Sequence, residues 1–455
     1  MVCAFVSLAF FGLGTATAEM PETAEAPESS ESQPEVWIPY EHYTLENGLE
    51  VILSEDHSVP FTWVNLWYGV GSKDEVEGRT GFAHLFEHLM FQGSEHHDDE
   101  YFIPLQRIGA RINGTTNFDR TNYFEGVPSE QLPLALWLES DRMGWLLPAL
   151  DEDKLKNQQD VVRNERRQSY ENRPYGMVWM WLFENLYPEG HPYHVPTIGK
   201  HEDIEAATLE DVKAFFRTWY VPNNATLSIC GDIDPEETKA LVEQYFGSIP
   251  SGPEPSPVLE APAELSSEVI VRKQDDVPHQ KVWIAWLTPK LYAEGDAEMD
   301  ILSSVLSAGK ESRLYSALVK DQRIAKSISA YQYSARLQSQ FIVEATAADG
   351  HTTDELVASI DAVLEEMGTS GVTEAEVDVA KTNWEADFYD GLLTISRKAN
   401  QLNSYFMITG DPGFITTDLG RYQTVTVDSV ERAYEANLGA ARVVLHVTPE
   451  TEEGT

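Results

Sequence analysis

Cysteine and basic residues are both scarce in this chain of 455 residues. Its two cysteines, Cys3 and Cys230, exclude a disulfide scaffold and a cysteine-based metal site. Lys and Arg total 32 against 75 Asp and Glu, which gives a formal net charge of −43 at pH 7. This charge argues against nucleic acids and anionic membrane surfaces as partners, because both repel an acidic protein.

The apolar run at the N-terminus is too short to span a bilayer. It covers Ala4–Gly14 and is followed by Ala16-Thr17-Ala18, a small-x-small cleavage site, although no Lys or Arg precedes it. We therefore predict a signal peptide over residues 1–18 and a periplasmic location. Residues 19–36 are acidic and rich in Pro, Ser and Ala, which predicts a disordered linker.

Histidine is also scarce, with 12 in the chain, yet two histidines lie four residues apart within Gly81–Ser94. On a helix His84 and His88 lie one above the other on the same face. Two imidazoles at this spacing can hold two corners of a tetrahedral zinc site, and Glu87 can reach a water on the same metal. The pattern is H-x-x-E-H, the reverse of the commoner H-E-x-x-H.

We expect this helix to be buried. Thr80 is placed to cap its start and Gly93 to end it, and most residues between them are apolar. Two histidines and a glutamate on a buried helix need polar partners, and a metal supplies them. The alternative is a helix that carries two surface histidines and a glutamate, and the apolar surroundings disfavour it.

A zinc site also needs a third protein ligand. A helix predicted from an Asp151 cap to about Tyr170 ends at Asn172-Arg173-Pro174. Three carboxylates on it or near its end are candidates, between which spacing alone does not choose: Asp160, Glu165 and Glu171. His96-His97 and the histidines of His191–His194 are rivals, but they lie in an acidic loop or beside Pro, where solvated loop histidines are expected.

Ala110–Tyr123 alternates and is rich in Thr and Asn, which predicts an extended segment. Asn113 and Gly114 within it are poorly suited to a core. A strand of this kind at a sheet edge leaves backbone N–H and C=O groups free for an extended ligand. An ordinary hairpin with a glycine bulge is an equal alternative on the residues alone.

The second half of the chain begins like the first. Val59-Pro60 precedes a predicted strand, a loop and the His84 helix, whereas Val277-Pro278 precedes a strand over Val282–Leu287, a loop and a helix over Ala297–Leu306. This pattern indicates an internal duplication in which the second copy has no histidine on its matching helix.

We therefore predict an α+β fold of two homologous α/β-sandwich domains, each a mostly antiparallel sheet packed with helices. Their boundaries are 37–248 for a domain that binds zinc and 265–455 for a homologous domain without metal, joined by a Pro-rich linker over 249–264. Asn47-Gly48 predicts a hairpin. Further predicted helices cover Thr208–Trp219, Glu236–Phe246, Thr353–Met367, Thr373–Asp387 and Leu393–Phe406, and Arg442–Val447 is a closing strand.

The chain resembles the pitrilysin/insulinase-type zinc peptidases, the inverzincin group, and most of all the short bacterial form related to mitochondrial processing peptidase. The resemblance covers nearly all of Tyr43–Val447. The stretches that carry it are Gly81–Ser94, Asn113 with Thr121-Asn122-Tyr123, Val161–Gln168, His191–Gly199, Tyr220–Asp232 and Ser312-Arg313-Leu314.

The resemblance implies a metalloendopeptidase that acts on unfolded peptides with one Zn²⁺ per chain. The family's third ligand is a Glu about 77 residues after the second His, which here is Glu165. Glu87 would be the general base. Many members carry a further Glu where this chain has Gln158, which can hydrogen-bond but cannot share the metal's charge. The stretch around Asn113 and Gly114 would be the substrate-binding edge strand, and members commonly have Ala in place of Gly114.

One departure from the family bears on how the chain works. Self-sufficient members carry in the second half an Arg and, seven residues on, a Tyr that hold the substrate. Here Val319 and Lys326 stand at those positions, and neither Arg323 nor Lys326 matches the pattern. We therefore predict the zinc-bearing subunit of a heterodimer, whose partner is a homologue that lacks H-x-x-E-H. The alternatives are a non-catalytic scaffold and a peptide-binding protein with a structural metal, and Mn²⁺ or Co²⁺ could bind the same ligands.

Overall fold

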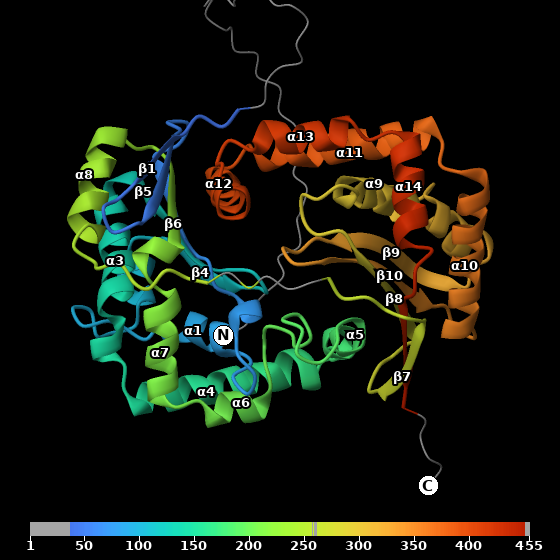
Figure 1. Ribbon diagram of the computed structural model, residues 1–455, viewed down its shortest axis with the longest axis horizontal. Helices are drawn as coiled ribbons and strands as arrows, with labels where there is room; N and C mark the ends of the chain where they lie inside the picture. The colour runs from blue at the N-terminus through green and yellow to red at the C-terminus, as the bar shows by residue number, and fades with distance from the viewer. Residues whose placement is uncertain (1–36, 257, 259–261, 451–455) are drawn as a thin grey trace, which may run out of the picture. The chain divides into compact units, whose positions relative to one another are not determined.

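The computed structural model describes residues 37–256, 258 and 262–450. The predicted signal peptide and acidic linker, residues 1–36, lie outside these residues. The described chain contains two β-sheets with helices packed on them (Figure 1), one sheet formed before the Pro-rich linker and one after it.

The first sheet has the strand order β1-β2-β6-β3-β5-β4. Its strands are β1 Glu41–Thr44, β2 Glu50–Glu55, β3 Phe61–Tyr68, β4 Arg111–Thr116, β5 Thr121–Pro128 and β6 Ala225–Gly231. All neighbours are antiparallel except β2 and β6. The predicted hairpin at Asn47-Gly48 joins β1 to β2, and Gly48 has the positive φ of 87° that such a turn requires.

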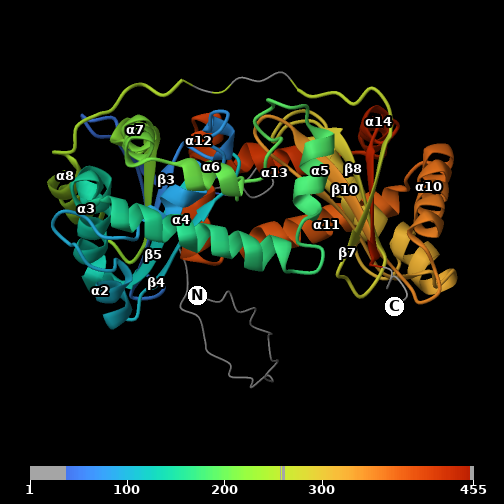
Figure 2. The same ribbon diagram turned by 90° about the horizontal axis from the view of Figure 1, so that it is seen from below.

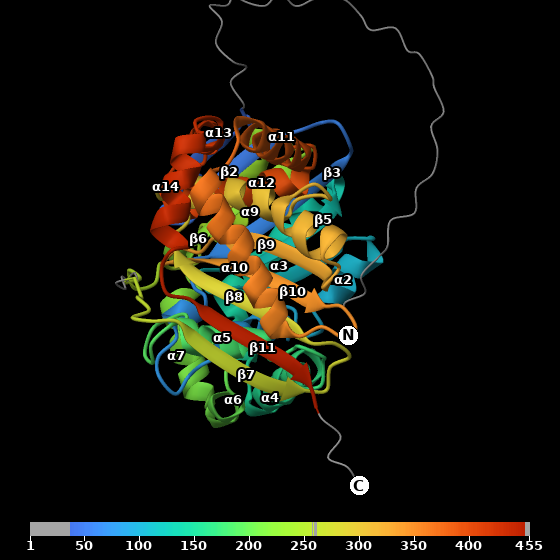
Figure 3. The same ribbon diagram turned by 90° about the vertical axis from the view of Figure 1, so that its right-hand side faces the viewer.

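The second sheet has the order β7-β11-β8-β10-β9 (Figure 3). Its strands are β7 Val269–Asp275, β8 Lys281–Thr288, β9 Ala325–Tyr333, β10 Ser339–Ala347 and β11 Val443–Pro449. Among the described strands of this sheet one pair is parallel, β7 with β11, and it lies at the sheet's edge.

The two sheets repeat one topology. β2, β6, β3, β5 and β4 correspond in order and direction to β7, β11, β8, β10 and β9, and β1 is an addition to the first sheet. The helices that follow β3 and β8 both begin at a left-handed glycine, Gly81 with φ 86° and Gly295 with φ 93°. These features agree with the predicted duplication, and the α+β class with two mostly antiparallel sheets is confirmed.

Helices cover one face of each sheet. Those from the first half are α1 Phe82–Leu89, α2 Phe102–Arg107, α3 Leu132–Ala149, α4 Glu152–Arg166, α5 Val178–Leu186, α6 His201–Ala206, α7 Leu209–Trp219 and α8 Pro235–Phe246. Those from the second are α9 Asp296–Ser307, α10 Thr353–Ser370, α11 Glu374–Gly391, α12 Ile395–Thr409, α13 Ile415–Gln423 and α14 Val427–Asn437. The apolar sides of α1, α3 and α7 form one large core with the first sheet, and those of α9, α10 and α14 form another with the second.

Each sheet's other face is covered by a helix from the opposite half. Helix α12 packs on β6 and β3, where Leu402 and Tyr405 are fully buried against Ile52 and Cys230. Helix α5 packs on β8 and β11, where Leu182 is fully buried (Figure 2). Because α5 and α12 hold equivalent places in the repeat, this exchange of helices ties the two halves together.

Several elements differ from the sequence-based expectation or were not anticipated. Strands β7, β9 and β10 and helices α5, α6, α13 and α14 had no counterpart in the prediction. Helix α3 is kinked at Trp145, whose φ is −132°. The predicted Asp151 cap is confirmed, since its side chain accepts a hydrogen bond from the Lys154 N–H at 2.8 Å.

Candidate metal centre

The structure brings the two histidines of α1 and Glu165 of α4 together. The Nε2 atoms of His84 and His88 lie 3.9 Å and 3.2 Å from Glu165 Oε2. The two imidazole rings are perpendicular, with centroids 4.8 Å apart. Among the described residues these three are the one group whose potential metal-ligating atoms lie within 4.8 Å of one another.

This arrangement fits a zinc ion. Ligand atoms about 2.0–2.1 Å from a tetrahedral metal lie roughly 3.3 Å from each other, close to the separations found here. Burial lowers the pKa of His84 to about 4, which favours the neutral imidazole that binds metals. The hydrogen bond from His88 lowers the pKa of Glu165, which favours its carboxylate form. With these three ligands a fourth position is open for water.

Glu87 is held from the neighbouring strand. Thr116 of β4 donates a hydrogen bond from Oγ1 to Glu87 Oε2 at 2.6 Å. Burial raises the pKa of this carboxyl above its usual value. Thr116 was not singled out from the sequence, although the period-two alternation of β4 places it on the same face as Gly114.

The segment expected over Ala110–Tyr123 contains β4, a turn and the start of β5, so it is a hairpin, without a bulge, whose first strand lies at the sheet edge. β4 is the last strand of the first sheet and pairs only with β5 among the described strands. Asn113 is exposed and Gly114 is buried against α1. A Cβ atom on Gly114 would lie 3.2 Å from Glu87 Cγ and 3.1 Å from the Tyr123 ring, so the absence of a side chain lets β4 approach the glutamate closely.

The start of α1 is stabilised differently from the expectation. Thr80 is not its cap: the helix follows Gly81, and the Thr80 hydroxyl donates to Asp203 Oδ2 at 2.5 Å. The carboxylate of Glu75 instead accepts hydrogen bonds from the N–H groups of Gly81 and Ala83, both at 2.8 Å. A carboxylate at a helix N-terminus is favoured by the helix dipole. Helix α1 also ends at Leu89, before Gly93.

The rival carboxylates lie elsewhere. Asp160 is 3.8 Å from Arg163, and Glu171 accepts from His201 at 2.8 Å and lies 3.3 Å from Arg166. Gln158 is buried on α4.

Two of the rival histidines, His96 and His194, form hydrogen bonds with other residues. His96 bonds to Asp141 at 2.5 Å, and His194 Nδ1 bonds to the Tyr187 carbonyl at 2.8 Å. The expectation of a solvated loop is wrong for His191, which is 9% exposed and stacks on Tyr187 with ring centroids 4.4 Å apart. Its burial follows from the packing of α5 on the second sheet, which the sequence did not reveal.

Val319 and Lys326 stand where the resemblance predicts an Arg and a Tyr, and both contact other residues of the second half. Lys326 Nζ pairs with Asp349 at 2.7 Å and lies 3.2 Å from His279 Nε2. Arg323 lies in the turn before β9 with a φ of 58°. Val319 packs on the core of the second half.

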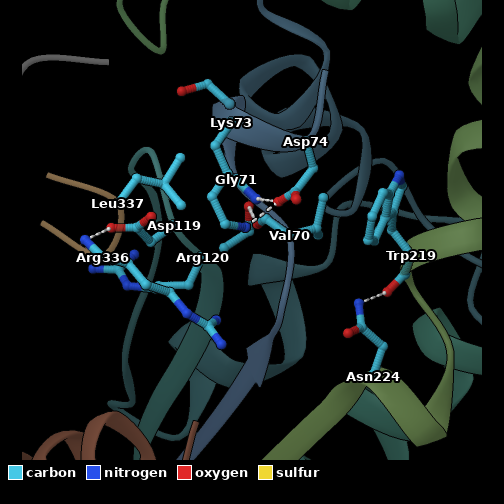
Figure 4. Close-up of polar contacts among 12 residues, drawn as sticks. Val70, Gly71, Lys73, Asp74, Asp119, Arg120, Trp219, Asn224, Arg336 and Leu337 are labelled. Atoms are coloured by element: carbon cyan, nitrogen blue, oxygen red, sulfur yellow. Dashed lines mark hydrogen bonds and ion pairs between the residues drawn. The ribbon is translucent and has the colours of Figure 1, made fainter. Parts of the chain in front are cut away.

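The turn between β4 and β5 contacts the second half next to the candidate site (Figure 4). Asp119 Oδ2 accepts a hydrogen bond from the Arg336 N–H at 3.0 Å. Its Oδ1 accepts from the Tyr193 hydroxyl at 2.7 Å, and that hydroxyl in turn accepts from the Leu337 N–H at 3.0 Å. The edge strand is therefore anchored at its turn by groups from both halves.

Over the described ranges, every helix is too short or too polar to cross a membrane.

Two family models match the chain. The model described as "Insulinase (Peptidase family M16)" matches residues 50–191, and that described as "Peptidase M16 inactive domain" matches residues 206–384. All four residues of the candidate site, His84, Glu87, His88 and Glu165, fall in the first match.

Relatives and solved structures agree with these matches. The zinc protease PqqE of Helicobacter pylori is 31% identical and aligns over 81% of this chain and 83% of its own length. The mitochondrial-processing peptidase subunit beta of Lentinula edodes is 22% identical and aligns over 87% of this chain and 86% of its own length.

A crystal structure of a protease from Helicobacter pylori superposes with a TM-score of 0.84 at 29% identity, covering 91% of this chain and all of that one. The first half of the periplasmic protease PqqL from Escherichia coli has the same fold, with a TM-score of 0.76 at 18% identity over 90% and 92%. The chain therefore belongs to the M16, or insulinase-type, peptidase family.

Proposed function

We propose that the chain is a zinc-dependent endopeptidase that hydrolyses peptide bonds in unfolded peptides. The observation that carries this proposal is the convergence of His84, His88 and Glu165 with Glu87 beside them. Relatives named zinc proteases, PqqE of Helicobacter pylori and YmxG of Bacillus subtilis, support it.

Each residue of the centre has a distinct task in this proposal. His84, His88 and Glu165 hold one Zn²⁺, which when bound lowers the pKa of a water and polarises the scissile carbonyl. Glu87 is the general base: Thr116 holds its Oε2, and Oε1 is left to take a proton from the attacking water and return it to the leaving nitrogen.

The substrate would bind as an added strand along β4. The side chain of Asn113 is exposed there, and the backbone groups of Gly114 on the unpaired side of the strand are available to an extended peptide. An extended segment can supply these hydrogen bonds, whereas a folded domain would have to unfold locally first.

We further propose that the chain works as the zinc-bearing subunit of a heterodimer. Val319 and Lys326 replace the Arg and Tyr that self-sufficient members use, and Lys326 is already paired with Asp349. The similarity to a protein named as a subunit, from Lentinula edodes, supports the presence of a partner, which we propose is a homologue without the zinc motif. Export to the periplasm is also proposed, on the strength of residues 1–18 and the similarity in fold to the periplasmic PqqL.

The domain boundaries are part of the proposal. Residues 37–248 would form the peptidase domain, 249–264 the linker and 265–455 the domain without metal. In the second half Glu298, Ile301 and Leu302 stand where the first has His84, Glu87 and His88, counted from the glycines that precede the two helices. Ile301 and Leu302 are buried, so apolar packing occupies the equivalent place.

Hydrolysis of a quenched fluorescent peptide by the purified chain tests the proposal. We expect the conservative change Glu87→Gln to lower the rate by about 10²–10⁴-fold while the bound zinc, measured by atomic absorption, is unchanged. Glu184→Gln, an exposed residue on α5, is the matched control and should keep the rate.

The same assay separates the alternatives. Activity that a chelator abolishes and that needs a homologous partner supports both the zinc site and the heterodimer. Full activity from the chain alone would contradict the proposal of a heterodimer. Bound zinc without activity in any mixture would favour the scaffold.

A further inference from the structure

Arg120 lies at the turn between β4 and β5, where it is held rigidly. The Asn117 side chain accepts hydrogen bonds from the N–H groups of Asp119 and Arg120 at 2.8 Å and 2.9 Å. The Asn117 N–H donates to the Arg120 carbonyl at 3.0 Å. Figure 4 shows the Arg120 side chain pointing away from Lys73 and Asp74.

The guanidinium of Arg120 lies on one face of the sheet, against Thr115 and Trp67. Its Nη1 donates to the Thr115 carbonyl at 2.8 Å and also to the Thr115 hydroxyl, and its Cζ lies 5.0 Å from the ring centroid of Trp67. Trp67, Asn122 and Thr115 are direct cross-strand neighbours, so their side chains share that face. Gly114 and Thr116 alternate with Thr115 and face α1.

Two of the three nitrogen atoms of this guanidinium are unused. Nε is buried without a hydrogen-bond partner, and Nη2 makes no hydrogen bond within residues 37–256, 258 and 262–450. No carboxylate of those residues forms an ion pair with Arg120, although the chain is strongly acidic and the adjacent Asp119 carboxylate accepts from Tyr193 and Arg336. Burial lowers the pKa of Arg120 to about 10, so the group remains charged at neutral pH. Arg120 is half-buried, and a half-buried cation with unused donors is suited to bind an anionic partner.

A peptide added along β4 would bring side chains to both faces of the sheet. Residues beside Gly114 and Thr116 would point towards α1 and Glu87, and the residue beside Thr115 would point to the opposite face. Directly paired residues have Cβ atoms about 4.5–5.5 Å apart, so that residue would lie within reach of the guanidinium bonded to Thr115.

We propose that Arg120 determines specificity by binding an acidic side chain of the substrate, one that points away from α1 and lies close to the scissile bond. This inference rests on the proposed peptidase function and names its substrate class: extended peptides with Asp or Glu at one fixed position. A local cation of this kind is needed because the acidic surface otherwise repels such peptides.

The test measures binding separately from cleavage. A neutral fluorescent peptide and derivatives with a single Asp, Asn or Lys at each position are titrated against the full zinc-loaded chain carrying Glu87→Gln, and Kd is read from anisotropy. At one position we expect Asp to bind about tenfold more tightly than Asn, as a charge-assisted hydrogen bond allows. Adding Arg120→Gln should abolish this preference, and Arg120→Glu should shift it towards Lys.

Two further variants make the result specific. Arg120→Lys keeps the charge without the fork of donors and should retain part of the preference. Arg217→Glu makes the same charge change at an exposed arginine of α7 and should leave the preference intact. Melting temperatures show whether each variant is folded, and if Arg120→Glu is not, Arg120→Gln carries the test.

The outcomes distinguish this inference from the proposed function. A preference for Asp that persists in the Arg120→Gln variant would overturn the inference. So would a finding that Asp is preferred at no position of the peptide. Both conclusions hold whether or not the unsubstituted chain cleaves the peptides. A preference that depends on Arg120, without cleavage by the chain with Glu87 intact either alone or mixed with a homologous partner, would support the inference and count against the peptidase.

Discussion

Glu75 is a residue whose importance only its surroundings reveal. In the sequence it is one of 75 acidic residues, in a polar loop. In the structure its carboxylate accepts two backbone N–H groups at the start of α1, three and one residues before His84. It therefore orients the helix that carries both histidines, a task that helix-capping rules assigned to Thr80.

The same residue makes folding stability depend on pH. Burial outweighs the two backbone N–H groups that favour the charged form of Glu75, and it raises the pKa of this carboxyl to about 8, from about 4.5 for a free side chain. The folded state then binds a proton that the unfolded state has lost, so stability falls as pH rises from 4.5 through 8. Glu75→Gln removes this titration, and the stability of the unsubstituted chain relative to the variant should fall by at least about 1.4 kcal/mol between pH 5 and 8.5.

Urea unfolding at the two pH values measures the difference. Glu77 is an exposed residue in the same loop, and the unfolding free energy of the Glu77→Gln variant should change between the two pH values as that of the unsubstituted chain does. Equal stability changes in the Glu75 and Glu77 variants would show that Glu75 does not titrate in this range.

At the scale of elements, the candidate metal centre joins two helices that lie far apart in sequence. Two of its candidate ligands are on α1 and the third is on α4, so a bound ion would cross-link these helices. Binding to the folded state alone stabilises it by about 2.7 kcal/mol at a free zinc concentration 100 times the Kd. Chelation should therefore lower the melting temperature of the unsubstituted chain.

Calorimetry checks this expectation by measuring the melting temperature, with and without chelator, of a variant that lacks one of the histidine ligands. The His84→Ala chain should show no response to chelator, and His57→Ala, at an exposed histidine, should respond fully. A chelator response that persists without His84 would place the metal elsewhere.

Helices α5 and α12 each pack on the sheet of the opposite half, and this exchange joins the two halves. Leu402 of α12 is fully buried against the first sheet, and its replacement by Ala should cost about 2–5 kcal/mol of unfolding free energy. Leu393, just before α12, is 79% exposed, so Leu393→Ala should change stability by less than about 0.5 kcal/mol. Denaturant unfolding compares the two, and similar losses would show that α12 is not packed on the sheet.

At the scale of the whole molecule, a net charge of −43 opposes the folded state through self-repulsion. Added salt screens this repulsion, because the Debye length falls from about 10 Å at 0.1 M to 3 Å at 1 M. We expect the melting temperature to rise between 0.1 M and 1 M NaCl. Sucrose at equal osmolarity controls for solvent effects, and a melting temperature that falls with salt would mean that attractive ion pairs outweigh the repulsion.

The sequence by itself predicted what depends on short stretches. The H-x-x-E-H spacing put His84, Glu87 and His88 on one helix, alternation identified the β4 strand, and Asp151 marked the start of α4. These features follow from the helical period, the strand period and local hydrogen bonds, which need no knowledge of distant residues.

Only the tertiary structure decided which distant residues meet. It brought Glu165 rather than Asp160 to the histidines, whereas from the sequence only the family resemblance favoured it. It also placed Thr116 against Glu87, and it buried His191, which its loop sequence had predicted to be solvated. The physical reason is that such contacts join segments dozens of residues apart, and they are set by the packing of sheets and exchanged helices rather than by the periodicity of any one segment.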